Sequence, residues 1–114
     1  MNAPEPRVVY QVRDFDLGRD FYKRVLGFEE TIVDFDERWA TLSRGEMHIA
    51  VTVGQPDEEG GVAMIDVDDI RAEADRLREA GIRVGTVVEI AGEMRLVDVF
   101  DPDGNRIQLA QAVA

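Results

Sequence analysis

The chain contains 114 residues, with 13 Lys and Arg against 24 Asp and Glu, and therefore carries a net charge of −11. This length, with 45% hydrophobic residues, is typical of one globular domain over residues 1–114. The absence of cysteine excludes disulfides, thiolate metal sites and thiol nucleophiles. The negative charge argues against nucleic acid and against an anionic membrane surface as partners.

The sequence also lacks signals for a membrane or for export. Its longest uninterrupted apolar run is residues 62–65, far below the roughly 20 residues of a membrane span. The first residues, MNAPEP, lack the basic and apolar regions of a signal peptide. We therefore expect a cytoplasmic protein.

The two halves of the chain repeat one pattern at an offset of 55 residues, since VRDF at 12–15 resembles VDDI at 67–70. In each half an apolar stretch ends in an acidic residue and a helical pattern follows. A first helix is predicted over 17–26, with one apolar stripe made of Leu17, Phe21, Val25 and Leu26. A second is predicted over 70–80, with a stripe made of Ile70, Ala74 and Leu77.

Acidic residues are placed to cap both helices, because their carboxylates accept from the free amides of a first turn. The candidates are Asp14 or Asp16 for the first helix, and Asp68 or Asp69 for the second. A glycine, which readily takes positive φ, follows each helix: Gly27 and Gly81. These glycines are 54 residues apart rather than 55, so the second helix is one residue shorter.

After each glycine the apolar period changes to two, which is typical of strands. The strands are predicted over 28–35, 38–44, 46–53, 82–91, 93–100 and 105–110, with a turn at DPDG, 101–104. The segment 55–61 is the expected linker, and its acidic run Asp57-Glu58-Glu59 is expected to be solvated.

The order of elements predicts an α+β fold of two tandem βαβββ modules, over 7–54 and 61–111. Placed side by side they form a half-barrel with a concave cleft. The alternative is a single α+β sandwich whose halves agree by chance.

These motifs resemble the vicinal oxygen chelate superfamily, which includes glyoxalase I, extradiol dioxygenases and bleomycin-resistance proteins. The resemblance is carried by VRDF at 12–15, FY and VLGF within 21–28, and DPDGN before IQL at 101–109. It covers about residues 7–111 and implies a ligand cleft. It also implies a homodimer, formed by side-by-side packing or by exchange of halves through 55–61.

In metal-dependent members of the superfamily, four inward-facing positions supply His, Gln or Glu ligands. The resemblance places these positions at Arg7, Ala50, Val62 and Gln108. A guanidinium repels a cation, and methyl and isopropyl groups offer no lone pair, so only Gln108 is close to the family pattern. We therefore expect no metal and no other cofactor.

Strand parity agrees with this register, because the alternate residues, which would face the helices, are almost all apolar. The cleft is predicted to contain Thr41, Thr52 and Asp66 beside the ligand-binding candidates. Those candidates are Arg7, Val9, Gln11, Trp39, His48, Ala50, Val62, Met64, Arg106 and Gln108.

Several of these side chains have more than one reading. His48 and Asp66 are candidates for acid–base catalysis, although a single histidine is most often structural. Arg7 can pair with Asp66 across the two modules, or it can meet an anionic group of a ligand. Trp39 can line the cleft or cap the core.

The leading hypothesis is a protein that binds a small organic molecule, such as a drug or metabolite, without a metal. The acidic charge fits the cationic ligands of the bleomycin-resistance branch. The alternative is an enzyme of the same superfamily: a lyase such as lactoylglutathione lyase, an isomerase or a dioxygenase. A third reading is a non-catalytic assembly module whose own side chains fill the cleft.

Overall fold

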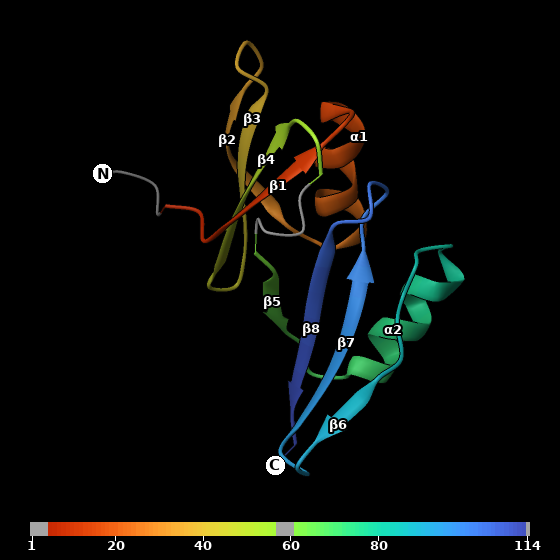
Figure 1. Cartoon of the computed structure of the whole chain (residues 1–114). Coiled ribbons are helices and arrows are strands. Elements are labelled where there is room, and N and C mark those ends of the chain that lie inside the picture. Colours follow the sequence, from red (N-terminus) through yellow and green to blue (C-terminus); the bar gives the residue numbers. More distant parts are fainter. Residues whose placement is uncertain (1–4, 57–60, 114) are drawn as a thin grey trace.

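The computed structural model describes residues 5–56 and 61–113, which form two βαβββ modules (Figure 1). The first module consists of β1 (Val8–Val12), α1 (Phe15–Asp20), the π-helix η1 (Phe21–Val25), β2 (Glu29–Asp34), β3 (Trp39–Arg44) and β4 (Met47–Val53). The second consists of β5 (Ala63–Asp66), α2 (Ile70–Glu79), β6 (Val88–Ile90), β7 (Met94–Phe100) and β8 (Arg106–Ala112). The predicted α+β class and tandem modules are confirmed.

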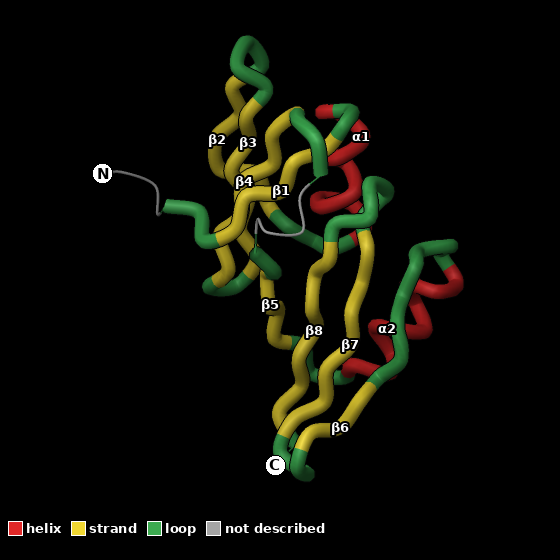
Figure 2. Tube along the Cα trace, in the orientation of Figure 1, coloured by secondary structure: helices red, strands yellow, loops and turns green. Residues whose placement is uncertain are grey.

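The two modules have the same sheet topology, which explains the repeat in the sequence. The strand orders are β1-β4-β3-β2 and β5-β8-β7-β6, with only the first pair of each order parallel. Helix α1 packs on β4, and α2 packs on β7 and β8. In Figure 2 both helices lie on one side of the strands, so the opposite face of each sheet, called here the open face, has no helix over it.

The side of each sheet that faces its helix forms the core, as the strand parity predicts. Its fully buried members include Val12, Ile49 and Val51 in the first module, and Ala63, Ile107 and Leu109 in the second. Because side chains of a strand alternate between faces, this burial leaves the other set on the open face.

The first helix is the element that differs most from the prediction. It begins at Phe15 rather than at residue 17, and Leu17, expected on the buried stripe, is 64% exposed. A π-turn over 21–25 accommodates the one extra residue of this helix and brings both Phe21 and Tyr22 into the core. Gly18 lies against Val12, where a Cβ would come within 2.7 Å of a valine methyl, so the helix can approach β1 closely.

The helix boundaries otherwise follow the predicted signals. Asp14 accepts a hydrogen bond from the amide of Leu17 at 3.0 Å, and Asp69 accepts from Ala72 at 3.1 Å. The chain leaves each helix through a glycine with positive φ, 74° at Gly27 and 82° at Gly81. The sequence left two candidates for each cap, and these hydrogen bonds identify Asp14 and Asp69 as the capping residues.

The strand boundaries match the predicted ones closely except in β6. The prediction extended that strand over 82–91, but the ladder with β7 covers only Val88–Ile90 and one bridge joins Val84 to Val99. The carbonyl of Gly85 instead accepts a hydrogen bond of 2.7 Å from Arg78 of α2. Of the predicted linker, residues 57–60, including the acidic run, lie outside the described residues.

The modules join through a buried polar network beside the edge strands β1 and β5. The hydroxyl of Tyr10 donates to the carbonyl of Arg106 at 2.6 Å and accepts from the amide of Ala63 at 2.9 Å. Its ring stacks on that of Tyr22, with 5.3 Å between centroids. These contacts hold β1 against both β5 and β8.

None of the helices in the described part of the chain has the length and apolar character needed to cross a membrane.

Candidate functional site

The open face of the first sheet is built from the residues that alternate with the core set. The pairing places Val9, Ala50 and Thr41 in one row, and Gln11, Thr52 and Trp39 in the next. His48 pairs with Ser43, and its carbonyl accepts a hydrogen bond of 2.8 Å from the amide of Arg7. Ala50 is fully buried between its larger neighbours, so the centre of this face is closed and mostly apolar.

The open face of the second sheet carries a cluster of charged and amide side chains. Met64, Gln108 and Asp98 pair in one row, and Arg106 pairs with Phe100 in an adjacent row. The Asp98 carboxylate accepts hydrogen bonds from Gln108 at 3.2 Å and from Arg106 at 3.5 Å. These two donors fix the orientation of Asp98.

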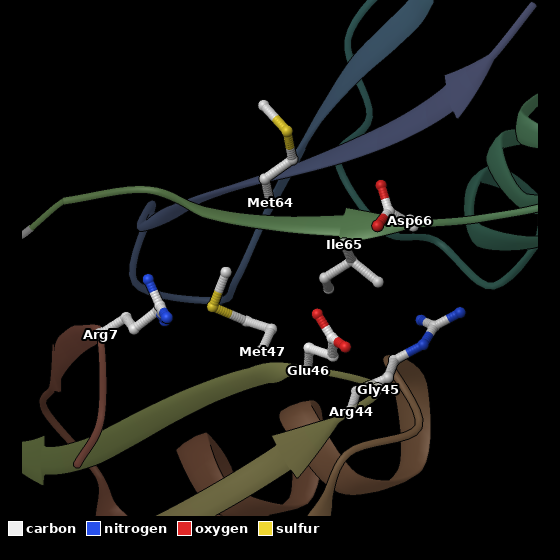
Figure 3. Close-up of a pocket in the computed structure, with 8 residues that line it drawn as sticks. All are labelled: Arg7, Arg44, Gly45, Glu46, Met47, Met64, Ile65 and Asp66. Carbon is white, nitrogen blue, oxygen red and sulfur yellow. The ribbon is translucent and has the colours of Figure 1, made fainter. Parts of the chain in front are cut away.

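Two cavities open near the junction of the modules. The first, of about 630 Å³, lies between the β3–β4 turn and β5 (Figure 3); it is lined by Arg7, Arg44, Gly45, Glu46, Met47, Met64, Ile65 and Asp66. The second, of about 600 Å³, lies beside the β7–β8 turn, and its lining includes Tyr10, Arg13, Val62, Asp98, Phe100 and Arg106. Both volumes suit an organic molecule of modest size.

The predicted ligand-binding residues are divided between these places. Arg7 and Met64 line the first cavity with Asp66, whereas Val62 and Arg106 line the second. The others, which line neither cavity, lie on the open faces: Val9, Gln11, Trp39, His48, Ala50 and Gln108. The convergence of all ten in one cleft therefore stays a prediction.

Arg7 and Asp66 share a cavity without forming an ion pair. Among the described residues neither has an oppositely charged group within salt-bridge distance. In Figure 3 the two side chains lie at opposite ends of the cavity. The structure therefore does not contain the ion pair between Arg7 and Asp66 that the sequence offered as one alternative.

The residues at the four expected metal-ligand positions do not fit a metal ion. They offer one guanidinium, two alkyl groups and one amide, and the amide of Gln108 already donates to Asp98. Within the ranges 5–56 and 61–113, no three His, Asp or Glu side chains gather as a metal site would require. The donor chemistry of this chain therefore disagrees with the superfamily's metal centre.

Sequence reasoning missed Asp98 and Phe100. Both lie on β7, where Val97 and Val99 are buried, so the alternation of this strand could have placed them on the open face. The cation of Arg83 lies 4.2 Å from the centroid of the Phe100 ring.

Tyr10 lines the second cavity, and its hydroxyl donates to the carbonyl of Arg106. Burial, partly offset by the bond from the Ala63 amide, raises the pKa of Tyr10 to about 12. At neutral pH the phenol therefore keeps its proton and does not act as a base.

The geometry defines a class of protein: two βαβββ modules with open sheet faces and ligand-sized cavities at their junction. The family model described as Glyoxalase/Bleomycin resistance protein/Dioxygenase superfamily matches residues 6–109. The chain belongs to this superfamily, as its motifs predict.

Solved structures share the fold at low sequence identity. An integron cassette protein from the mobile metagenome of the Halifax Harbour sewage outfall has a TM-score of 0.80 at 19% identity, covering 91% of this chain and 94% of that chain. TnmS3, an antibiotic binding protein from Streptomyces sp. CB03234, has a TM-score of 0.73 at 22% identity, and the match covers 98% of each chain. Lactoylglutathione lyase from Agrobacterium tumefaciens has a TM-score of 0.72 at 19% identity, covering 96% of this chain and 94% of that chain. A comparison with proteins of curated function gives no match.

Proposed function

We propose that this protein binds a small organic molecule at the module junction without a metal ion. The observation that carries the proposal is the chemistry at Arg7, Ala50, Val62 and Gln108, which lacks the donors of a metal site. Ala50 supports it further, because this residue is fully buried between Val9 and Thr41 and its methyl group offers no lone pair to an ion.

The cavities support binding of an organic ligand rather than an assembly role. Each combines a few charged groups with apolar or aromatic walls, as ligand pockets do. TnmS3, an antibiotic binding protein, has the same fold.

Turnover is the alternative, and Asp98 is the observation that favours it. Its carboxylate lines the second cavity and is oriented by Gln108 and Arg106, as a general base must be. His48 and Asp66 remain candidates on other parts of the junction. Chemical analysis of a bound compound before and after incubation separates binding from catalysis.

We also propose that the protein forms a homodimer through its open faces. Large apolar side chains are exposed on β6 of the second sheet, with both Val88 and Ile90 at 49%. They pair with Leu96 and Met94, which alternate with the buried Val97, so they lie on the open face. A second copy would remove this apolar area from water.

The test is native mass spectrometry and metal analysis of protein that has met no chelator. We expect no stoichiometric metal, and a copurified organic compound or saturable binding in a screen of drugs and metabolites. A stoichiometric bound metal, or no binding across the screen, would contradict the proposal.

A further inference from the structure

Arg7 is unusual because it has no ion-pair partner among the described residues, although the chain is rich in acids. All 13 cationic side chains lie within the described ranges, against 24 Asp and Glu in the whole chain. Among the described residues only Arg7, Arg38 and Arg71 have neither an ion pair nor an aromatic ring beneath the guanidinium.

Arg7 alone of these three lines the first cavity, together with the apolar side chains of Met47 and Met64. Figure 3 shows its guanidinium beside Met47, with Met64 on the facing strand β5. The other cation of the cavity, Arg44, is engaged: it donates to the carbonyl of Leu26 at 2.8 Å and lies 3.9 Å from Glu73. A guanidinium that forms no ion pair with any described residue, next to two flexible thioethers, is suited to an anionic group attached to an apolar body.

The opposite end of the cavity limits the charge of such a ligand. Glu46 and Asp66 also line it; in Figure 3 Asp66 lies at the end away from Arg7, with Arg44, and Glu46 lies between the two arginines. A second negative group that extended toward this end would meet these two carboxylates. The net charge of −11 further disfavours polyanions.

We propose that the first cavity binds an organic monoanion, whose carboxylate or sulfonate pairs with Arg7 while its apolar body contacts Met47 and Met64. The inference rests on the proposed binding function and names the chemical class of the ligand.

Three ligands with the same ten-carbon chain test the proposal by isothermal titration calorimetry on the purified protein. They are decanoate, with one carboxylate; decanedioate, with two; and decyltrimethylammonium, a cation. We expect decanoate to bind at least about tenfold more tightly than either of the others, a difference of roughly 1.4 kcal/mol. Equal or tighter binding of decanedioate would overturn the proposal.

Two variants test whether decanoate binds at Arg7. Arg7→Gln should weaken decanoate binding about tenfold and leave binding of the neutral alcohol decanol unchanged. Arg71→Gln is the matched control, because Arg71 is an exposed arginine on α2 that does not line the cavity and has no ion-pair partner among the described residues. This variant should bind decanoate as the native protein does. Thermal melting of each variant verifies that it is folded.

The outcomes separate the two proposals. If Arg7→Gln binds decanoate as tightly as the native protein, or if the cation binds more tightly than decanoate, the assignment of a monoanion to Arg7 is wrong although the binding function stands. If neither these ligands nor the screen of drugs and metabolites gives any binding, the binding function itself fails.

Discussion

The hydroxyl of Tyr22 in the first module donates a hydrogen bond of 2.8 Å to Oδ2 of Asp101 in the second. Asp101 is only 5% exposed, and it also accepts from the backbone amides of Asp103 and Asn105 and from the Asn105 side chain. The Asn105 side chain in turn donates to the carbonyl of Gln11 in β1. The DPDGN motif thus joins the modules, and each of its buried polar atoms has a partner.

Removing the Tyr22 hydroxyl should therefore destabilise the whole fold. We expect Tyr22→Phe to lower the free energy of unfolding by about 1–3 kcal/mol, because one bond to a buried carboxylate is lost. Chemical denaturation measures the change. The control is Asp20→Asn, which breaks an exposed pair with Arg24 and should cost below about 1 kcal/mol. A Tyr22→Phe cost no larger than that of the control would contradict the assigned role.

The two tyrosines of the chain should titrate late in the native state. Burial raises the pKa of Tyr10 to about 12 from 10.0, and burial and the adjacent Asp101 raise the pKa of Tyr22 well above its ordinary value. Above pH 10 the unfolded chain loses these protons before the native chain does, so stability is full below pH 10 and falls between pH 10 and about 12. Tyrosinate absorbance should thus rise near pH 10 only in denaturant. A native titration near pH 10 would show that the phenols are not buried.

The phase of the first helix can be tested with two leucines. Leu17 is 64% exposed whereas Leu77 of α2 is fully buried, although the sequence places both on apolar stripes. Leu17→Ala should change stability by less than about 0.5 kcal/mol, and Leu77→Ala should lower it by about 2–5 kcal/mol. Urea midpoints compare the two variants. Similar losses would mean that the first helix packs with the phase predicted from sequence.

Metal removal should leave the protein unchanged. With a guanidinium and two alkyl groups at the expected ligand positions, incubation with a chelator should not shift the melting temperature, and added zinc or manganese should not raise it. Differential scanning calorimetry measures both. A chelator-induced fall in melting temperature that one equivalent of metal reverses would require a site elsewhere in the chain.

The open face of β6 provides the test for a dimer. Replacing both Val88 and Ile90 with Lys should shift the protein toward the monomer, because charged side chains would then lie in the apolar contact. Light scattering during size-exclusion chromatography measures the mass. Leu17→Lys, at an exposed apolar position on α1, should keep the native mass. A monomeric native protein would refute the proposed association.

Much of the fold follows from local patterns in the sequence. An acidic cap before each helix, the glycines after the helices and the alternation along the strands act over a few residues, so they were predictable, although the structure had to choose Asp14 and Asp69 as the caps. The π-turn was not, because a helical period counted along the chain does not reveal where an extra residue is absorbed. Its position, and with it the exposure of Leu17, depends on how the helix packs against β1.

The candidate site, too, was predictable from the sequence only in part. Strand parity predicted which side of each strand forms the core, and the resemblance placed the expected metal-ligand positions at residues poor in metal donors. Only the tertiary structure decided that Arg7 and Asp66 stay apart, that Asp98 is held by Gln108 and Arg106, and that two cavities open at the junction. These relationships join residues from different strands and modules, and the angle and separation of packed sheets are set by the whole core rather than by any one segment.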